Sequence, residues 1–192
     1  RPYEPEKGML SLIGGFVKND ESVDTAAQRV LTQFTGLKDL YMRQLRAFGE
    51  VERDKGERVI SVAYYALINV GDYNSNQSDN HGAYWTEINE LPELCFDHNQ
   101  MVKEALKELQ KSVFEKEICN NLLPEFFTLS KLQTLHEAIL GLPVDKRNFR
   151  RSILDRDYII KTDKIDKSGS KRGAILYRFN EKVYRKAPKF KL

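Results

Sequence analysis

The chain has 192 residues, of which 41% are hydrophobic; this suffices for one large domain or two small ones and argues against general disorder. The formal net charge of +3 conceals an uneven distribution: residues 145–192 carry sixteen Lys and Arg against six acidic residues, or +10, whereas residues 1–144 carry fifteen against 22, or −7. No apolar run is long enough to cross a bilayer and no signal-peptide pattern occurs, so we expect a cytoplasmic protein with no membrane partner. A concentrated positive charge favours a polyanionic partner, and the commonest is nucleic acid.

The first residues predict a strand followed by an amphipathic helix. Met9–Val17 is an apolar stretch punctuated by a glycine turn at Gly14–Gly15. A helix follows, capped by Asp20 or Ser22 and stopped by Gly36 in the position of a left-handed cap residue. Its apolar side chains recur at the spacing that places them on one face, namely Val23, Ala26, Ala27, Val30, Leu31 and Phe34.

Three further strands or strand fragments and a closing helix are expected before residue 115. Tyr41–Phe48 and Arg58–Val70 are rich in β-branched and aromatic residues, Tyr84–Thr86 is a shorter candidate, and polar loops separate them. A helix is predicted from about Asn99 to Phe114. This order predicts an α/β or α+β sandwich up to about residue 115, and the first residues resemble the exit from an element, so we expect that a further piece precedes Arg1.

A second unit is expected over residues 123–192, with the pattern of a winged helix-turn-helix domain. Thr128 caps a helix that ends at the next glycine. Asp145 then caps a second helix, on which Phe149 and Ile153 sit four positions apart and face inward. The two helices are therefore predicted to pack on each other across a short turn.

The polar residues of this second unit indicate DNA binding. Tyr158–Ile160 and Ala174–Phe179 predict a hairpin, or wing, with a basic tip. A helix that carries Arg and Asn opposite an apolar side suits the major groove, while a basic wing follows the backbone or reaches a minor groove. The alternative is a merely solvated surface, but such surfaces normally mix charge signs. The candidate DNA-binding residues are Ser130, Lys131, Gln133, Lys146, Arg147, Asn148, Arg150, Arg151, Lys164, Lys167, Lys171 and Arg172.

The first unit carries the frame of a known enzyme motif without its acids. Gly15, Glu21, Arg29 and Gly36-Leu37 stand at the spacing of the Nudix box, G-x5-E-x7-R-E-U-x-E-E-x-G-U, where U is bulky and apolar. The resemblance to the Nudix fold covers roughly residues 1–115, and in Nudix hydrolases the box glutamates hold Mg²⁺ on a diphosphate. The resemblance implies an α+β protein in which residues 1–118 form an α/β/α sandwich, with further strands ahead of Arg1. The glutamate positions after the arginine here hold Val30, Gln33 and Phe34. We therefore expect no catalytic residue, no metal site and no cofactor.

A degenerate Nudix domain followed by a winged helix resembles the Nudix-related transcriptional regulators of the NrtR family. Residues 145–151 and the preceding Glu137–Gly141 closely resemble that family's DNA-binding segment, and the match covers nearly the whole chain. Residues 126–133 and 161–173 further resemble its arabinose-responsive branch from gut bacteria. The resemblance implies a homodimer whose Nudix-like body binds a small effector, with L-arabinose as the first candidate, and thereby changes affinity for double-stranded operator DNA.

The effector pocket is expected near the old substrate cleft. Sugar sites need amides or carboxylates that bridge hydroxyls, together with aromatic faces. Plainer interpretations compete: Arg29 pairs with Glu21, Tyr64 is a core residue, and His98 bonds to the start of a helix. The candidate effector-binding residues are Glu4, Lys7, Arg29, Glu52, Arg53, Arg58, Tyr64, Asp97 and His98.

Two other functions compete with the regulator. One is a Nudix-like hydrolase of ADP-ribose or a sugar nucleotide, with Glu50, Glu52 and Asp54 as candidate metal ligands outside the box. The other is a constitutive architectural DNA binder with an empty body. Cys95 and Cys119 have no second Cys or His at metal-ligand spacing, which predicts structural thiols in a reduced compartment.

Overall fold

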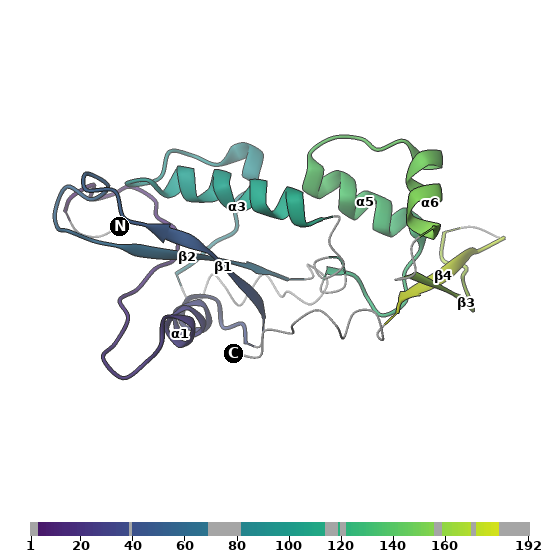
Figure 1. The fold of residues 1–192 in the computed structure, drawn as a ribbon, viewed down its shortest axis with the longest axis horizontal. Coiled ribbons are helices and arrows are strands. Elements are labelled where there is room, and N and C mark those ends of the chain that lie inside the picture. Colours follow the sequence, from purple (N-terminus) through teal and green to yellow (C-terminus); the bar gives the residue numbers. More distant parts are fainter. Residues whose placement is uncertain are drawn as a thin grey trace. The chain divides into compact units, whose positions relative to one another are not determined.

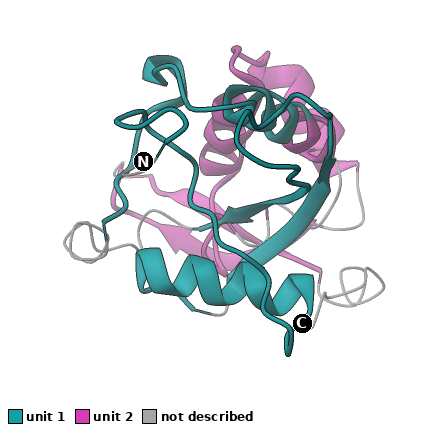
Figure 2. Cartoon of the chain, turned by 90° about the vertical axis from the view of Figure 1, so that its left-hand side faces the viewer, with its two compact units in different colours: residues 1–107, 192 teal, residues 108–191 magenta. Residues whose placement is uncertain are grey.

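The computed structural model describes residues 4–38, 40–68, 82–113, 119, 122–155, 159–169 and 172–180. It divides into two compact units, the first reaching Lys107 and the second beginning at Glu108 (Figure 1 and Figure 2). Each unit combines helical segments with a two-stranded antiparallel sheet, so the protein is of the mixed helix and strand class.

The first unit is built on the amphipathic helix α1 (Val23–Thr35). The hydroxyl of Ser22 accepts a hydrogen bond from the Thr25 N–H and so caps the helix. Gly36, at φ 71°, ends it in the left-handed conformation that glycine adopts without strain. Both predicted ends are confirmed, with Ser22 rather than Asp20 as the cap.

A sheet lies between α1 and the first part of α3 (His98–Ser112), as Figure 1 and Figure 2 both show. It pairs β1 (Tyr41–Phe48) with β2 (Ser61–Leu67) in antiparallel fashion. Helix, sheet and helix therefore form three layers, in agreement with the predicted α/β/α arrangement.

Side chains tie this sheet to the helix on either side of it. Arg46 of β1 donates two hydrogen bonds, at 2.6 and 2.7 Å, to the carboxylate of Glu104 in α3, and this holds the pKa of Glu104 at about 2. On the other side, the Tyr64 hydroxyl donates to the carboxylate of Asp24 in α1. Tyr64 pairs with Gln44, two positions before Arg46, so regular alternation would place Arg46 on the same face as Tyr64; the register shift between Gln44 and Ala47 allows Arg46 to face the other helix.

Two predicted strands of the first unit are wrong. Among the described residues, Met9–Val17 pairs only through one parallel bridge between Leu10 and Leu94, and Phe16 is 84% exposed. Tyr84–Thr86 has no strand structure and precedes the short 3-10 helix η3 (Ile88–Glu90). A strand needs a neighbour that takes its backbone hydrogen bonds, and apolar composition alone does not supply one.

The other predicted elements differ only at their ends. β2 begins at Ser61 rather than Arg58, and α3 begins at His98 rather than Asn99. Residues 69–70 and Phe114, at the expected ends of these elements, lie outside the described residues.

The second unit has the predicted order of helix, turn, helix and hairpin. Thr128 and Asp145 cap the two helices, and Gly141, at φ 70°, ends the first of them. The predicted first strand was too short, because it continues well past Ile160; its expected first residue, Tyr158, lies outside the described residues. The elements are α5 (Leu129–Leu140), α6 (Lys146–Leu154), β3 (Ile159–Asp166) and β4 (Ala174–Phe179).

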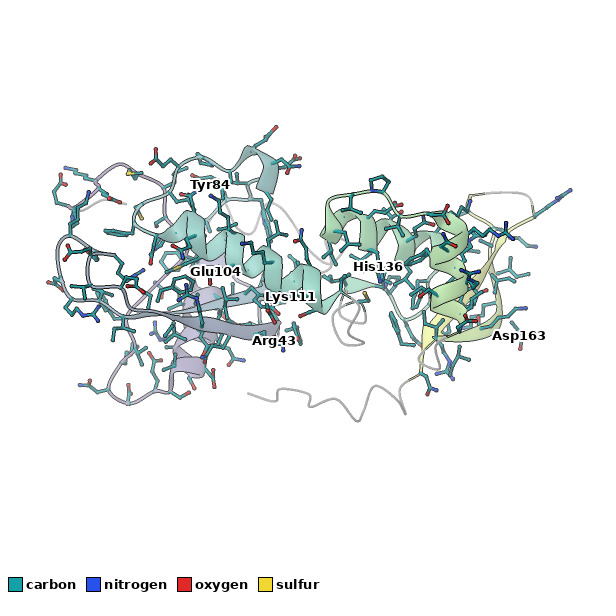
Figure 3. All side chains as sticks on the ribbon, turned by 45° about the horizontal axis from the view of Figure 1, so that its top comes forward. Arg43, Tyr84, Glu104, Lys111, His136 and Asp163 are labelled. Carbon is teal, nitrogen blue, oxygen red and sulfur yellow. The ribbon has the colours of Figure 1, made fainter. Side chains whose placement is uncertain are left out.

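Aromatic side chains form the core of the second unit. Phe127 is fully buried, exchanges backbone hydrogen bonds of 3.0 and 2.8 Å with Tyr177 of β4, and packs on Phe179 at 4.6 Å between ring centroids. His136 of α5, labelled in Figure 3, meets Phe149 of α6 edge to face at 5.0 Å. These contacts join the helices and the hairpin into one body and leave the opposite side of α6 to solvent.

Candidate functional site

The exposed side of α6 is a basic surface. Phe149 and Ile153, 6% and 3% exposed, bury the inward side of the helix. An α-helix turns by about 100° per residue, so Arg147 and Arg151 point away from that side. The Arg151 guanidinium donates to the Asn148 side-chain oxygen at 3.4 Å. The predicted DNA-reading residues of this helix are all exposed, and we call them the α6 basic face: Lys146, Arg147, Asn148, Arg150 and Arg151.

Two polar side chains of α5 hold the turn that leads into α6. The Val144 N–H donates to Glu137 Oε1 at 3.0 Å, and the Val144 carbonyl accepts from Gln133 Nε2 at 3.1 Å. Gln133 Nε2 also donates to Glu137 Oε1 at 3.0 Å. The Val144 N–H and then the Gln133 amide lower the pKa of Glu137 below its ordinary value. The sequence predicted Gln133 as a DNA contact and did not single out Glu137. The one sequence signal for Glu137 was its position four residues after Gln133, which places the two side chains side by side on a helix.

The wing is shaped by an irregular β3 and by one glycine. The pairing of β3 with β4 shifts between Lys161 and Ile165, where the Thr162 hydroxyl donates to the Leu176 carbonyl at 2.6 Å. Gly173 lies at φ 71°, and a Cβ there would come 2.2 Å from Cγ2 of Ile165. Only glycine therefore fits where the chain returns into β4.

The basic wing residues do not all point to the tip. Lys164 places its Nζ 3.4 Å from the ring centroid of Phe126, so its charge packs on the protein's own surface. Lys167 and Arg172 are exposed near the turn of the hairpin, and Lys171 lies outside the described residues. At the first turn of α5, the predicted contacts Ser130 and Lys131 are both exposed.

In the first unit, the glutamate and the arginine of the box frame bind each other. Arg29 donates from Nε to Glu21 Oε2 at 2.9 Å and from Nη2 to Oε1 at 2.5 Å, and its Nη2 also donates to the Phe16 carbonyl at 3.0 Å. The guanidinium, followed by the backbone N–H of Lys18, holds the pKa of Glu21 at about 2. The pairing that competed with ligand binding for Arg29 is confirmed.

The acid positions of the box do not fit a divalent metal ion. Val30 is 7% exposed, and a Cβ added to Gly15 would come 2.8 Å from its Cγ2, so the box loop lies directly on an isopropyl group. Phe34 is half-buried and Gln33 is a neutral, exposed amide. In the part of the chain that the structure describes, no three His, Cys, Asp or Glu side chains are grouped to hold a metal ion. Proteins usually hold Mg²⁺ through one or more carboxylates, and the three box positions supply none.

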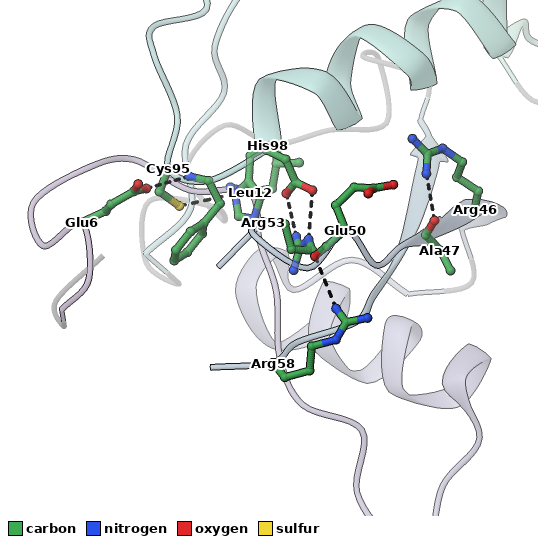
Figure 4. A network of polar contacts seen from close by, with 11 residues as sticks. Glu6, Leu12, Arg46, Ala47, Glu50, Arg53, Arg58, Cys95 and His98 are labelled. Atoms are coloured by element: carbon green, nitrogen blue, oxygen red, sulfur yellow. Dashed lines mark hydrogen bonds and ion pairs between the residues drawn. The ribbon is translucent and has the colours of Figure 1, made fainter. Parts of the chain in front are cut away.

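A buried ion pair joins two loops of the first unit (Figure 4). Arg53 donates from Nε and Nη2 to the two oxygens of Asp97 at 2.9 and 2.6 Å, and the Arg53 side chain is 4% exposed. Beside the pair, His98 Nδ1 accepts from the Leu12 N–H at 3.1 Å. That bond leaves the proton of a neutral imidazole on Nε2. Arg53, Asp97 and His98, three of the predicted effector residues, therefore lie together.

The other predicted effector residues make different contacts or are exposed. Arg58 donates to the Glu50 carbonyl at 3.3 Å, which places it in the same network (Figure 4). Tyr64 contacts Asp24 instead, and partial burial together with that carboxylate raises the pKa of Tyr64 to about 12. Glu4, Lys7 and Glu52 are exposed.

Two acids near these groups were missed by sequence reasoning. Glu6, rather than Glu4, reaches the loop before α3, where its Oε2 accepts from the Phe96 N–H at 2.7 Å. Asp24 binds Tyr64 across forty positions of sequence. No local pattern marks either residue, because each partner is distant in the chain.

The two cysteines lie in the interior of the described structure. Both Cys95 and Cys119 are buried, and burial raises the pKa of Cys119 to about 12, which makes it a poor nucleophile. Of the helices in the described ranges, none combines the length and apolar character needed to cross a membrane.

Known proteins resemble this chain over most of its length. The profile of the NrtR DNA-binding winged helix domain matches residues 119–179. The ADPR responsive transcriptional repressor NtrR of Acinetobacter baylyi is 32% identical over 183 residues, covering 93% of this chain and 73% of that protein. The crystal structure of Shewanella oneidensis NrtR complexed with a 27mer DNA has a TM-score of 0.77 and 29% identity, covering 96% of this chain and 86% of that one. An ADP-ribose pyrophosphatase of Methanocaldococcus jannaschii is 31% identical over 107 residues, covering 56% of this chain and 63% of that protein. The chain therefore belongs to the NrtR family of DNA-binding transcriptional regulators, in which a Nudix-like domain precedes a winged helix domain.

Proposed function

We propose that the chain is a homodimeric regulator of sugar utilisation genes, with an effector-binding and dimerisation domain at residues 1–118 and a DNA-binding domain at residues 123–192. The α6 basic face carries this proposal, because Arg and Asn on an exposed helix bridge guanine and adenine edges in the major groove. In a homodimer, the two copies of α6 would take the half-sites of an inverted repeat. We keep the cytoplasm as the proposed location, since the regulator must reach operator DNA.

The proposed effector contains a five-carbon sugar. The Acinetobacter baylyi relative is named as responsive to ADPR, which supports ADP-ribose as the effector of this chain. The resemblance of residues 126–133 and 161–173 to the arabinose-responsive branch supports L-arabinose. Both compounds present a pentose whose neighbouring hydroxyls suit carboxylates and amides. The groups around Arg53 and Asp97, and around Tyr64 and Asp24, are the proposed contact regions.

Effector and DNA are proposed to act on each other through the dimer. An effector that favours a geometry unable to fit both half-sites lowers operator affinity, and operator DNA must then lower effector affinity by the same factor. The test is a thermal-shift screen with L-arabinose, D-xylose and ADP-ribose, followed by titration of the same compounds against protein bound to selected DNA. We expect one pentose compound to raise the melting temperature and to change DNA affinity. If all three leave both quantities unchanged, the effector class is wrong.

A hydrolase is the second candidate, and the Methanocaldococcus jannaschii relative, an ADP-ribose pyrophosphatase, favours it. The box helix opposes it, since Val30 and Phe34 replace acids there and the first of them is buried. Among the acids outside the box, Asp54 already accepts a hydrogen bond from the Gly56 N–H at 2.8 Å. Release of AMP from ADP-ribose with Mg²⁺ or Mn²⁺ would establish the hydrolase; no release is expected.

A further inference from the structure

We propose that Glu137 and Gln133 are positioning residues for operator recognition: they fix the direction in which α6 leaves its turn, and through it the fit of the α6 basic face to base edges. Glu137 is assigned no contact with DNA, and Gln133, a candidate DNA contact by sequence, is held here by Glu137 and Val144. The inference rests on the proposed binding of operator DNA through α6.

The first observation is that these two side chains occupy both backbone polar groups of one turn residue. Val144 donates its N–H to Glu137 at 3.0 Å and accepts at its carbonyl from Gln133 at 3.1 Å. A third bond of 3.0 Å, from Gln133 to Glu137, closes the triangle and fixes each side chain by the other. Two hydrogen bonds to the backbone of Val144 restrict both the position and the rotation of this residue, because hydrogen bonds weaken steeply when bent.

The second observation is that the fixed residue leads directly to the reading surface. Val144 precedes Asp145, whose carboxylate accepts from the Asn148 N–H at 2.8 Å and caps α6. The Asn148 side-chain oxygen in turn accepts from Arg151 at 3.4 Å. Hydrogen bonds, together with the peptide bond between Val144 and Asp145, therefore connect the middle of α5 to Arg151 on the outer side of α6.

The third observation concerns what else fixes the orientation of α6. It has nine residues, and a helix of that length is marginal by itself. Its buried anchors, Phe149 and Ile153, lie on one side only, and apolar contacts are non-directional. They hold α6 onto the unit from that side, and the hydrogen bonds at Val144 add a directional restraint on the chain that enters the helix. Bidentate contacts to bases tolerate little displacement, whereas phosphate contacts carry no sequence information.

The charge of Glu137 makes the inference testable. A carboxylate on a DNA-binding unit repels phosphates, so removing it should by charge alone strengthen binding to any DNA. If Glu137 positions α6, removing it should instead weaken binding to the specific sequence. Charge and positioning thus predict opposite signs, and the ratio of specific to non-specific affinity separates positioning from general stability.

The experiment compares three variants with the wild-type chain. Glu137→Ala removes the acceptor, Glu137→Gln removes the same charge but keeps an oxygen for Val144, and Glu125→Ala removes an exposed acid elsewhere in the same unit. The probes are a duplex that the wild-type chain selects from a random pool of 27 base pairs, the length used in the Shewanella oneidensis complex, and a shuffled duplex. We expect Glu137→Ala to lose about tenfold in specific affinity, in the range of a lost base contact, while Glu137→Gln stays within about threefold of wild type. Binding to the shuffled duplex should be unchanged or stronger for all three.

Circular dichroism establishes that each variant is folded at the assay temperature. Should Glu137→Ala not fold, Gln133→Ala provides the second test, because it removes the bond to the Val144 carbonyl and leaves the Glu137 bond in place; we expect an intermediate loss of specific affinity. Equal specificity ratios in folded wild type, Glu137→Gln and either alanine variant would overturn the inference while leaving operator binding intact. If the wild-type chain selected no sequence at all, the proposed function would fall and the inference with it.

Discussion

Replacing Gly15 with alanine tests whether the box loop packs on a hydrocarbon side chain where an enzyme would hold metal. The added Cβ would lie 2.8 Å from Cγ2 of Val30, whereas carbon atoms attract best at about 3.5–4.0 Å. Val30 is 7% exposed, and a β-branched residue in a helix has one strongly preferred rotamer, so it cannot turn aside. Overpacking of this kind costs about 1–3 kcal/mol. We expect Gly15→Ala to lower the free energy of unfolding of the first unit by this amount, or the melting temperature by about 4–8 °C for each kcal/mol.

The neighbouring glycine provides the matched control. A Cβ at Gly14 would meet only the Leu12 carbonyl oxygen, at 3.9 Å, so Gly14→Ala should stay within about 0.5 kcal/mol of wild type. Val30→Ala makes room for the new methyl group, and the double variant with Gly15→Ala should therefore be less destabilised than the sum of the two, by about 0.5–3 kcal/mol.

Urea unfolding followed by tryptophan fluorescence reports on the first unit, because Trp85 is the single tryptophan and lies there. Strictly additive effects of the substitutions at Gly15 and Val30 would refute the proposed contact. So would equal destabilisation by alanine at Gly14 and at Gly15.

Three further predictions concern the reading helix, the box ion pair and the wing. Arg151→Ala should weaken binding to the selected duplex by about 1–3 kcal/mol and binding to shuffled DNA by less; equal losses in a filter-binding assay would make it a phosphate contact. Because Arg29 lowers the pKa of Glu21 from 4.5 to about 2, the stability it contributes should be complete above pH 4.5 and lost as pH falls toward 2. In the Glu21→Gln variant, the free energy of unfolding measured with urea should depend less on pH in that window. An unaltered pH dependence would contradict the role of the pair. Gly173→Ala should distort the wing, since left-handed backbone alone costs about 1–2 kcal/mol for alanine and its Cβ would approach Ile165 to 2.2 Å. Fewer phosphate contacts should then reduce the salt dependence of DNA affinity, so an unchanged slope of log affinity against log salt would speak against a DNA-contacting wing.

The degenerate box explains how a hydrolase frame can serve a regulator. Gly15 and Gly36 still set the loop and the end of α1, and Arg29 still binds Glu21. These contacts stabilise the fold whether or not a metal ion is present. The positions that hold the metal-binding glutamates in Nudix hydrolases need not be acidic in this chain. One of them, Val30, is buried and contributes to the packing. The structural part of the motif is thus separable from its chemical part.

Operator binding and effector binding place different demands on the sequence. The α6 basic face needs only exposed side chains at helical spacing, so its five residues could be predicted together and all prove exposed. To predict which effector-binding residues lie together, one would have to know which loops meet in the fold. Arg53 and Asp97 are 44 positions apart, and His98 reaches Leu12 across 86 positions. The grouping of Arg53, Asp97 and His98, and the contact of Tyr64 with Asp24, therefore appear only in the folded chain.

The sequence by itself determined the features that depend on neighbouring residues. Helix caps such as Thr128 and Asp145, the left-handed end at Gly141 and the inward side of α6 follow from local backbone chemistry and helical periodicity. Tertiary structure decided what depends on a distant partner. Met9–Val17 has strand composition but only a bridge to Leu94, since backbone pairing requires a neighbour in space. In the same way, the acid of Glu137 gains its place at Val144 only because α5 and the turn fold back on each other.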